Sequence, residues 1–433
     1  MPALLQLPQL DAGERTRASA KGAKQPSAAG GESLRRSLAA ELTLVLGQLA
    51  APNARPLTVG VLGGSISQGE YVAVGQAYTE LLHTSSSASN GKGVHILNRA
   101  IPATGCSMAS FCFDELLPPS DELDAVVIEY AVNDGHFQRW HTESILNGAS
   151  GGREPMSPLA SMERLVRHVR LTRPRTTPLI LYMCDPLSTE ACDGLYSPVA
   201  RAYGLRELSL ARALGNESTS VHWQMSHPDA TGHVAAALTV ARALLGLVAA
   251  VPPTARPELP AARYLPNWES NRRWRCKTCD WLGCERFQPV TSRSYGGRFA
   301  VQTWRSKGAR VPPSIGGVKA AAVSKAGWAA DVPGGEIAFP VPEARARVLV
   351  AFLCSYESVG EAEVTFTPVN STLAMLAARR WLRVTLRWSQ QSSQQCIFNA
   401  GETTGPSNVH VRVAASSTAG AQVKVFGVYS QHT

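Results

Sequence analysis

Four apolar runs, each followed by polar or turn-forming residues, constrain the fold of this 433-residue chain most strongly. A run that is apolar throughout is typical of a strand buried on both faces of a parallel sheet. A helix is expected between the third and fourth runs, because Leu159 to Thr172 has helical periodicity and Pro174 would end it. Strands that alternate with helices predict a parallel α/β sheet. The runs are residues 57–65 (LTVGVLGGS), 94–101 (VHILNRAI), 124–134 (DAVVIEYAVND) and 177–185 (TPLILYMCD).

The rest of the chain divides around this α/β region, and its length fits two domains. Residues 1–31 are rich in Ala, Gly, Ser and Lys, have little to bury, and are expected to be disordered. Residues 32–250 form the α/β domain, which begins with a helix over Glu32–Ala50 and ends with one over about residues 231–247. A Pro-rich linker covers residues 251–262. Residues 263–433 contain segments that alternate polar and apolar, such as Glu361–Phe366, and predict a second, all-β sandwich-like domain.

Charge and hydropathy exclude some classes of partner. The formal net charge is +9, but the basic residues are scattered and do not interleave with aromatic residues, so nucleic-acid binding is not expected. The longest apolar stretch, Val234–Val251, is interrupted by Thr239 and Arg242 and is interpreted as an amphipathic helix. No stable membrane span is therefore predicted. The N-terminus lacks a convincing signal peptide, because its apolar part is short and broken by prolines.

The nine cysteines leave at least one thiol unpaired within the chain. Cys276, Cys279 and Cys284 form the densest cluster. A structural zinc site normally needs four ligands, and no histidine lies beside these three cysteines. Disulfides, free thiols and a zinc site all remain open here, and no metal or organic cofactor is expected for the chemistry.

Polar groups that can carry chemistry follow the predicted strands. Ser65 ends the first strand, Asn133 and Asp134 end the third, and His227 lies just before the final helix. The carboxyl ends of parallel strands meet at one edge, where ligands bind in α/β sheets. A serine hydroxyl needs a base within hydrogen-bond reach to become a nucleophile, and His227 is the candidate.

An acyl-transfer intermediate also needs fixed donors for its oxyanion. The N–H of Ser65, an N–H from the loop at residues 103–105, and the Asn133 amide are the candidates, and Gly64 permits a tight turn. The glycine-rich turn has neither the Lys-Ser/Thr of a P-loop nor the spacing of a dinucleotide-binding motif. His233 is a competing histidine that is expected to pack or cap, and Cys106 is expected to pack or to pair with Cys112.

These segments resemble the conserved blocks of the SGNH or GDSL hydrolases. GGSISQG is similar to their first block, NRAIPATG to the second, AVND to the third and QMSHPDATGH to the last. The resemblance extends to a subgroup of algal, plant and fungal capsule-associated-like proteins that carry a C-terminal β region. It implies a three-layer α/β/α, flavodoxin-like domain, and a location in the secretory pathway or outside the cell. The catalytic residues that it implies are Ser65, His227 and Gln224, and the oxyanion or substrate-binding residues are Gly64, Ala103, Gly105 and Asn133.

The chain departs from this pattern at the residue that would orient the proposed base, His227. The family places an aspartate three residues before the histidine, and this chain has Gln224 there, which can accept a hydrogen bond but has no charge. Asp229 is expected to cap the final helix instead. The leading function is hydrolysis of an acyl ester, such as an O-acetyl group on a carbohydrate, with an acylated carbohydrate or other small ester as partner. The alternatives are a polysaccharide O-acyltransferase with the same site and a non-catalytic protein that binds glycans or partners.

Overall fold

The structure is a computed structural model. It describes most of the α/β domain and the strands of the β region. The described residues are 28–50, 56–87, 93–119, 122–135, 157–185, 192–224, 226–249, 259–265, 274–278, 300–302, 327–330, 333–355, 359–371, 380–386, 393–417 and 422–432.

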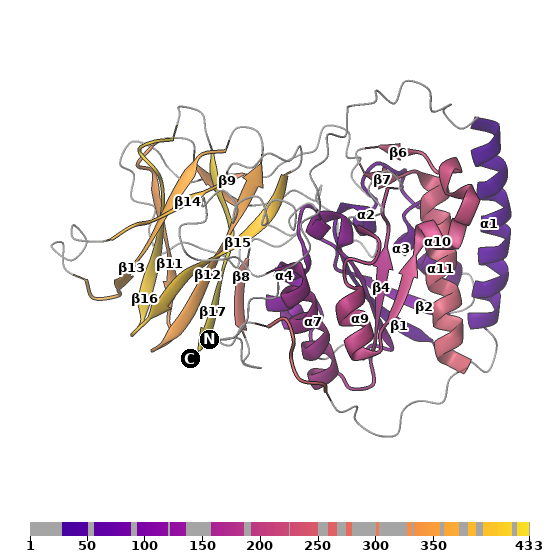
Figure 1. Ribbon diagram of the computed structural model, residues 1–433, viewed down its shortest axis with the longest axis horizontal. Coiled ribbons are helices and arrows are strands. Elements are labelled where there is room, and N and C mark those ends of the chain that lie inside the picture. Colours follow the sequence, from indigo (N-terminus) through magenta and orange to yellow (C-terminus); the bar gives the residue numbers. More distant parts are fainter. Residues whose placement is uncertain are drawn as a thin grey trace, which may run out of the picture.

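A parallel sheet forms the centre of the α/β domain, as predicted (Figure 1). Its strands are β1 (Leu57–Gly63), β2 (Val94–Asn98), β3 (Ala125–Glu129), β4 (Thr177–Tyr182) and β5 (Arg206–Ser209). They lie in the order β2-β1-β3-β4-β5, and every neighbouring pair is parallel. This is the flavodoxin-like order, which places a topological switch point between β1 and β3. Strand β5 was not anticipated from the sequence.

Helices cover both faces of this sheet (Figure 1). Helices α1 (Ala28–Leu49), α3 (Tyr78–Ser87), α10 (Leu210–Leu214) and α11 (Ala230–Ala249) share a buried apolar cluster with Val59 and Val61 of β1. Helices α4 (Cys106–Phe111), α5 (Phe113–Leu116), α7 (Pro158–Thr172) and α9 (Ser197–Tyr203) share a second cluster with Leu62 and Val126. The three-layer α/β/α architecture is therefore confirmed.

The predicted helices are present with small shifts at their ends. Helix α7 begins after Ser157, whose side chain accepts a hydrogen bond from the Ala160 N–H at 3.2 Å. Helix α1 begins at Ala28, so the last four residues of the segment that was expected to be disordered are helical. Residues 1–27 lie outside the described part of the chain.

Within the described part of the chain, one helix is long and apolar enough to cross a membrane by these two criteria alone. This helix is α11, and 61% of its most apolar window is buried inside the protein. It packs on α1 and α3, which is the environment of a core helix.

The C-terminal region is all-β and consists of two antiparallel sheets (Figure 1). One sheet has the order β15-β12-β17-β10-β9, with β8 also paired to β17, and the other has the order β11-β16-β13-β14. Their apolar faces share a core that includes Phe339, Phe352 and Val411. The strands are β8 (Trp274–Thr278), β9 (Ala300–Gln302), β10 (Gly327–Ala330), β11 (Glu336–Val341), β12 (Ala346–Ser355), β13 (Glu361–Pro368), β14 (Leu382–Thr385), β15 (Ser393–Thr403), β16 (Ser407–Val413) and β17 (Val423–His432).

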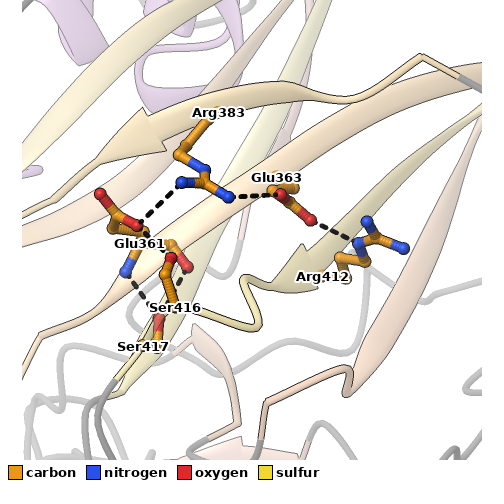
Figure 2. A network of polar contacts seen from close by, with 6 residues as sticks. All are labelled: Glu361, Glu363, Arg383, Arg412, Ser416 and Ser417. Atoms are coloured by element: carbon orange, nitrogen blue, oxygen red, sulfur yellow. Dashed lines mark hydrogen bonds and ion pairs between the residues drawn. The ribbon is translucent and has the colours of Figure 1, made fainter.

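The opposite face of the four-stranded sheet carries a network of alternating charges (Figure 2). Glu363 accepts a hydrogen bond from Arg412 at 2.6 Å and from Arg383 at 3.3 Å. Arg383 also lies 3.8 Å from Glu361, and Arg412 stacks on the ring of Trp381 at 3.9 Å. The period-2 pattern of these strands predicts a sheet with one apolar face and one charged face, as observed.

Aromatic side chains on the faces of a β-sandwich can stack on sugar rings, so the other tryptophans of this domain are candidates for that role, although tryptophans are also ordinary core residues. Trp328 is partly buried and packs against the core, and the Trp274 side chain lies outside what the structure describes. Trp268, Trp281, Trp304 and Trp388 lie outside the described residues. The sugar-binding role of this domain stays a prediction.

The residues that directly follow the predicted linker are attached to the α/β domain. Glu163 of α7 is fully buried and accepts hydrogen bonds from the backbone N–H groups of Arg263, Tyr264 and Leu265 at 2.6 to 2.9 Å. The Tyr203 hydroxyl also donates to this carboxylate, at 2.9 Å, and a buried carboxylate with four donors is well compensated for its lost hydration. Residues 250–258 lie outside the described part of the chain.

The cysteines are mostly cross-linked where the structure describes them. Disulfides join Cys184 to Cys192 and Cys354 to Cys396. Cys112 is disulfide-bonded, whereas Cys106 is a free, buried thiol, so the expected alternative of a Cys106–Cys112 pair is wrong. Cys279 and Cys284 lie outside the described residues, and among the described residues no group of His, Cys, Asp or Glu has the arrangement of a metal site.

Candidate active site

The structure brings Ser65 and His227 together, although they are 162 positions apart in the sequence. Ser65 is the first residue of α2 (Ser65–Gln68), directly beyond the carboxyl end of β1. His227 begins the two-residue strand β7 (His227–Pro228). The Ser65 Oγ lies 2.6 Å from the His227 Nε2, which is hydrogen-bonding distance. With Nε2 unprotonated, the imidazole accepts the hydroxyl proton, which is the geometry of a serine activated by a base.

Two glycines before Ser65 allow neighbouring groups to approach the turn closely. A Cβ on Gly63 would lie 2.2 Å from the Ser67 Oγ, and a Cβ on Gly64 would lie 2.6 Å from the Asn133 Nδ2. Gly64 has extended dihedral angles, so the glycine is required here by space rather than by conformation. A side chain at position 64 would therefore collide with the Asn133 amide in this structure.

The loop at residues 101–105 lies beside the same turn. Ile101 donates its N–H to the Gly63 carbonyl at 2.9 Å, and the Asn133 Nδ2 donates to the Thr104 carbonyl at 2.7 Å. Ala103 has a left-handed φ of 60°, and Gly105 caps the N-terminus of α4. Gly64, Ala103, Gly105 and Asn133 thus surround the turn that carries Ser65. An oxyanion at this turn would need donors, and the N–H groups of this loop stay the candidates for that role.

Asp134 supports this loop and does not contact His227. Its carboxylate accepts the Cys106 N–H at 3.1 and 3.2 Å and also the hydroxyl of Tyr196. A Cβ on Gly105 would lie 2.1 Å from the Asp134 Oδ1, which explains the glycine. Burial raises the pKa of Asp134 to about 7, although the bonds from Tyr196 and Cys106 act in the opposite direction. No pattern in the sequence indicated Tyr196 as a partner of this site.

His227 also packs against an aromatic ring that sequence reasoning missed. The ring centroids of Tyr71 and His227 are 4.5 Å apart and the planes are tilted by 49°. Tyr71 is 46% exposed. Within the described residues, the non-glycine residues with left-handed φ are Tyr71, Ala103 and Ser226, and all three adjoin this site. Such strained conformations concentrate at functional sites.

Gln224 does not orient His227 through a hydrogen bond in this structure. It belongs to β6 (Trp223–Gln224), which pairs with β7 so that Gln224 lies opposite His227. Its side chain is exposed and makes no hydrogen bond with any described residue. The orienting role that the family pattern implies for Gln224 is therefore not visible in the geometry.

The other acidic and histidine candidates near His227 have structural partners. The Asp229 Oδ1 accepts the N–H groups of Thr231 and Gly232 at 3.0 and 3.1 Å, so Asp229 caps α11 as expected. His233 is fully buried, and its Nδ1 accepts the Tyr78 N–H at 3.2 Å. Burial and the nearby His227 lower the pKa of His233 to about 3, so its ring is neutral. His233 packs, as expected, and does not contact Ser65.

A buried polar network lies beneath the serine turn. The Ser67 Oγ donates to Glu129 at 2.8 Å and lies 2.8 Å from the Tyr78 hydroxyl. All three side chains are almost completely buried. Burial raises the pKa of Glu129 to about 8, although hydrogen bonds from Ser67 lower it. The network holds α2 through its residue Ser67. Among the described contacts, none of its side chains reaches His227.

Cys106 is a poor alternative nucleophile. Its thiol is fully buried, and burial together with the nearby Asp134 raises its pKa well above the usual value. A thiol that stays protonated is weakly nucleophilic. Ser65 is therefore the better candidate nucleophile at this site.

Comparison with known proteins supports the fold. No family model matches the sequence, and no curated protein matches it. A two-domain esterase (CEX) active on acetylated mannans aligns with a TM-score of 0.54 at 17% identity, over 91% of this chain and 95% of that one. Its structure co-crystallised with mannopentaose aligns with a TM-score of 0.53. AlinE4, an SGNH-hydrolase family esterase, covers 40% of this chain with a TM-score of 0.30 and 15% identity.

The CEX esterase is itself a two-domain protein, and its alignment spans both domains of this chain. The protein therefore has the two-domain fold of that esterase, a parallel α/β sheet followed by an antiparallel β region. At 17% identity the likeness concerns the fold. The capsule-associated-like subgroup stays a prediction.

Proposed function

We propose that the protein is a serine esterase that removes an acyl group, with an O-acetyl group on a carbohydrate as the substrate class. The hydrogen bond of 2.6 Å between the Ser65 Oγ and the His227 Nε2 is the observation that carries this proposal. The activity of the CEX esterase on acetylated mannans supports the choice of substrate, because that protein shares both domains with this chain.

The proposed reaction begins with attack of the Ser65 Oγ on the ester carbonyl carbon while the His227 Nε2 takes the hydroxyl proton. The carbonyl oxygen becomes an oxyanion, which the Ser65 N–H, an N–H of residues 103–105 and the Asn133 amide stabilise. The C–O bond to the sugar then breaks, and the sugar oxygen leaves with the proton from His227. Water repeats the sequence on the acyl-enzyme, so the products are a carboxylic acid and free Ser65.

The same site is compatible with transfer of the acyl group to a sugar hydroxyl in place of water. The two reactions differ in the acceptor alone, so product analysis distinguishes them. Incubation with p-nitrophenyl acetate and a manno-oligosaccharide should yield acetate. Acetylated oligosaccharide as the main product would assign the protein as a transferase.

A fluorophosphonate probe tests the activated serine directly. We expect the wild-type protein to be labelled and to hydrolyse p-nitrophenyl acetate, and we expect Ser65→Ala to lose both, with a fall in kcat of about 10³-fold or more. Ser37→Ala, on the exposed side of α1, is the matched control and should behave as the wild type. Folded wild-type protein that neither reacts with the probe nor hydrolyses the ester would favour the non-catalytic binding protein.

A further inference from the structure

The β domain contacts the candidate active site through one strand. Strand β15 is at the edge of its sheet among the described strands, and its Gln395 lies opposite Leu353 of β12. The backbone N–H of Gln395 is not directed into that sheet. It donates to the carbonyl of Ala103 at 2.8 Å. An edge strand has unused N–H groups on its outer side, and here one of them is satisfied by a loop of the other domain.

The acceptor of this bond is in a strained conformation. Ala103 has a φ of 60°, which an L-residue with a Cβ adopts at a cost that glycine does not incur. Thr104 is held on either side: its N–H and hydroxyl donate to the Ile101 carbonyl, and its own carbonyl accepts the Asn133 amide. The hydrogen bond from the Gln395 N–H to the Ala103 carbonyl holds the residue before Thr104 in the same way.

Side chains extend the same contact to the helix that follows the loop. The Gln395 Nε2 donates to the Tyr429 hydroxyl at 2.9 Å, and the Tyr429 ring stacks on Phe111 of α4 with centroids 5.5 Å apart. Gln395, Tyr429 and Phe111 are each at most 6% exposed. Figure 1 shows α4 on the side of the α/β domain that faces the β domain, and α4 contacts both β15 and β8. The apolar core on that side of the sheet continues into the β domain.

We infer that the Gln395 N–H is a positioning group for the loop at residues 101–105, which carries candidate oxyanion donors. The β domain would then hold this loop in its catalytic conformation, in addition to any part in binding the carbohydrate. This inference rests on the proposed function. The bond keeps Ala103 in the left-handed conformation, and that conformation sets the direction of the N–H groups at residues 103–105. Turnover of a small ester that is too short to reach the β domain should therefore still depend on β15.

Removal of this single N–H tests the inference. Gln395→Pro deletes the donor on the outer side of an edge strand, where proline is tolerated. Gln395→Ala is the matched control, because it keeps the N–H and loses the bond to Tyr429. With p-nitrophenyl acetate we expect Gln395→Pro to lower kcat by about 10- to 100-fold with KM changed by less than about threefold. Gln395→Ala should have a kcat at least about threefold higher than that of Gln395→Pro, because it keeps the N–H.

A rescue variant separates positioning from simple loss of stability. Glycine adopts the left-handed conformation without the strain of alanine. The double variant Ala103→Gly, Gln395→Pro should therefore have a kcat at least about threefold higher than that of Gln395→Pro alone. A double variant as slow as Gln395→Pro, or a Gln395→Pro protein within about twofold of the wild type, would overturn the inference.

Amide exchange on the wild-type protein gives a test that needs neither activity nor the proline variant. The Gln395 N–H should exchange at least about 100-fold more slowly than an unprotected amide, because it is buried in a hydrogen bond. Exchange at the rate of an unprotected amide would show that the hydrogen bond from the Gln395 N–H to the Ala103 carbonyl is not formed. If the wild type is inactive toward esters and probe, the proposed function fails, and the exchange rate still decides whether β15 holds the loop.

Discussion

His227 illustrates at the scale of single residues how this site departs from the family pattern. Its Nε2 contacts Ser65 and one side of its ring packs against Tyr71, but the side chain opposite it in the β6–β7 pair is the uncharged Gln224. The tilted contact with Tyr71 restricts the His227 ring but supplies no negative charge to balance the imidazolium. A carboxylate at this position would do both, and in serine-protease triads the loss of that charge costs about 10⁴-fold in rate.

Gln224→Asp should raise kcat/KM at pH 8 by about tenfold, because a carboxylate opposite His227 would stabilise the imidazolium that forms during attack. The same charge should raise the pKa of His227, so the acid limb of the pH–rate profile should move to higher pH. Gln224→Asn has the same shape as the aspartate and no charge, and it is the control. If the Asp variant is no faster than the Asn variant, another group orients the imidazole.

At the scale of secondary-structure elements, the turn between β1 and α2 rests on the buried carboxyl group of Glu129. The pKa of this group is raised from its ordinary value of 4.5 to about 8, first because of burial. Folded protein therefore keeps a proton on Glu129 between about pH 5 and pH 8, whereas unfolded protein releases it. The free energy of unfolding must then fall as the pH rises through this interval.

Glu129→Gln should remove this part of the pH dependence, because the amide keeps the neutral form at every pH. In urea titrations between pH 5.5 and pH 9 we expect the wild type to lose stability more steeply than the variant. Asp134, whose pKa is raised to about 7 by burial, acts in the same direction and leaves a residual slope in both proteins. Glu217→Gln, in the exposed 3-10 helix Gly215–Ser220, is the control and should follow the wild type. Parallel curves for Glu129→Gln and the wild type would contradict the raised pKa.

The elements differ in how far they could be predicted. The runs that became β1, β3 and β4 are apolar throughout because both faces of these strands are buried, and that signal is local. Strand β5 is short, lies at the sheet edge and carries Arg206 and Glu207, so it has no continuous apolar run. Helix α2 has four residues, too few to show a periodicity.

At the scale of the whole molecule, the disulfide between Cys354 and Cys396 joins β12 to β15, the strand that carries Gln395. It closes a loop with a sequence separation of 42. A cross-link of this kind lowers the entropy of the unfolded chain by an amount that grows with loop length. The β domain that contacts the active-site loop is therefore stabilised through the same strand.

The double variant Cys354→Ala, Cys396→Ala should lose about 4 kcal/mol of unfolding free energy in the chain-entropy model, measured by urea denaturation without reductant. Cys106→Ala is the control, because it removes a buried sulfur that forms no disulfide. A loss in the double variant no larger than twice that of Cys106→Ala would show that the cross-link itself contributes little.

The sequence by itself determined the α/β sheet, the positions of Ser65, Asn133 and His227 after its strands, and the cap at Asp229, because each of these depends on local patterns. Only the tertiary structure decided which side chains meet them. Tyr71 against His227, Tyr196 on Asp134 and Gln395 on Ala103 are joined across many residues of chain, and no spacing in the sequence encodes these partners. A strand or helix follows from its neighbours along the chain, whereas the environment of a catalytic group follows from packing between distant elements.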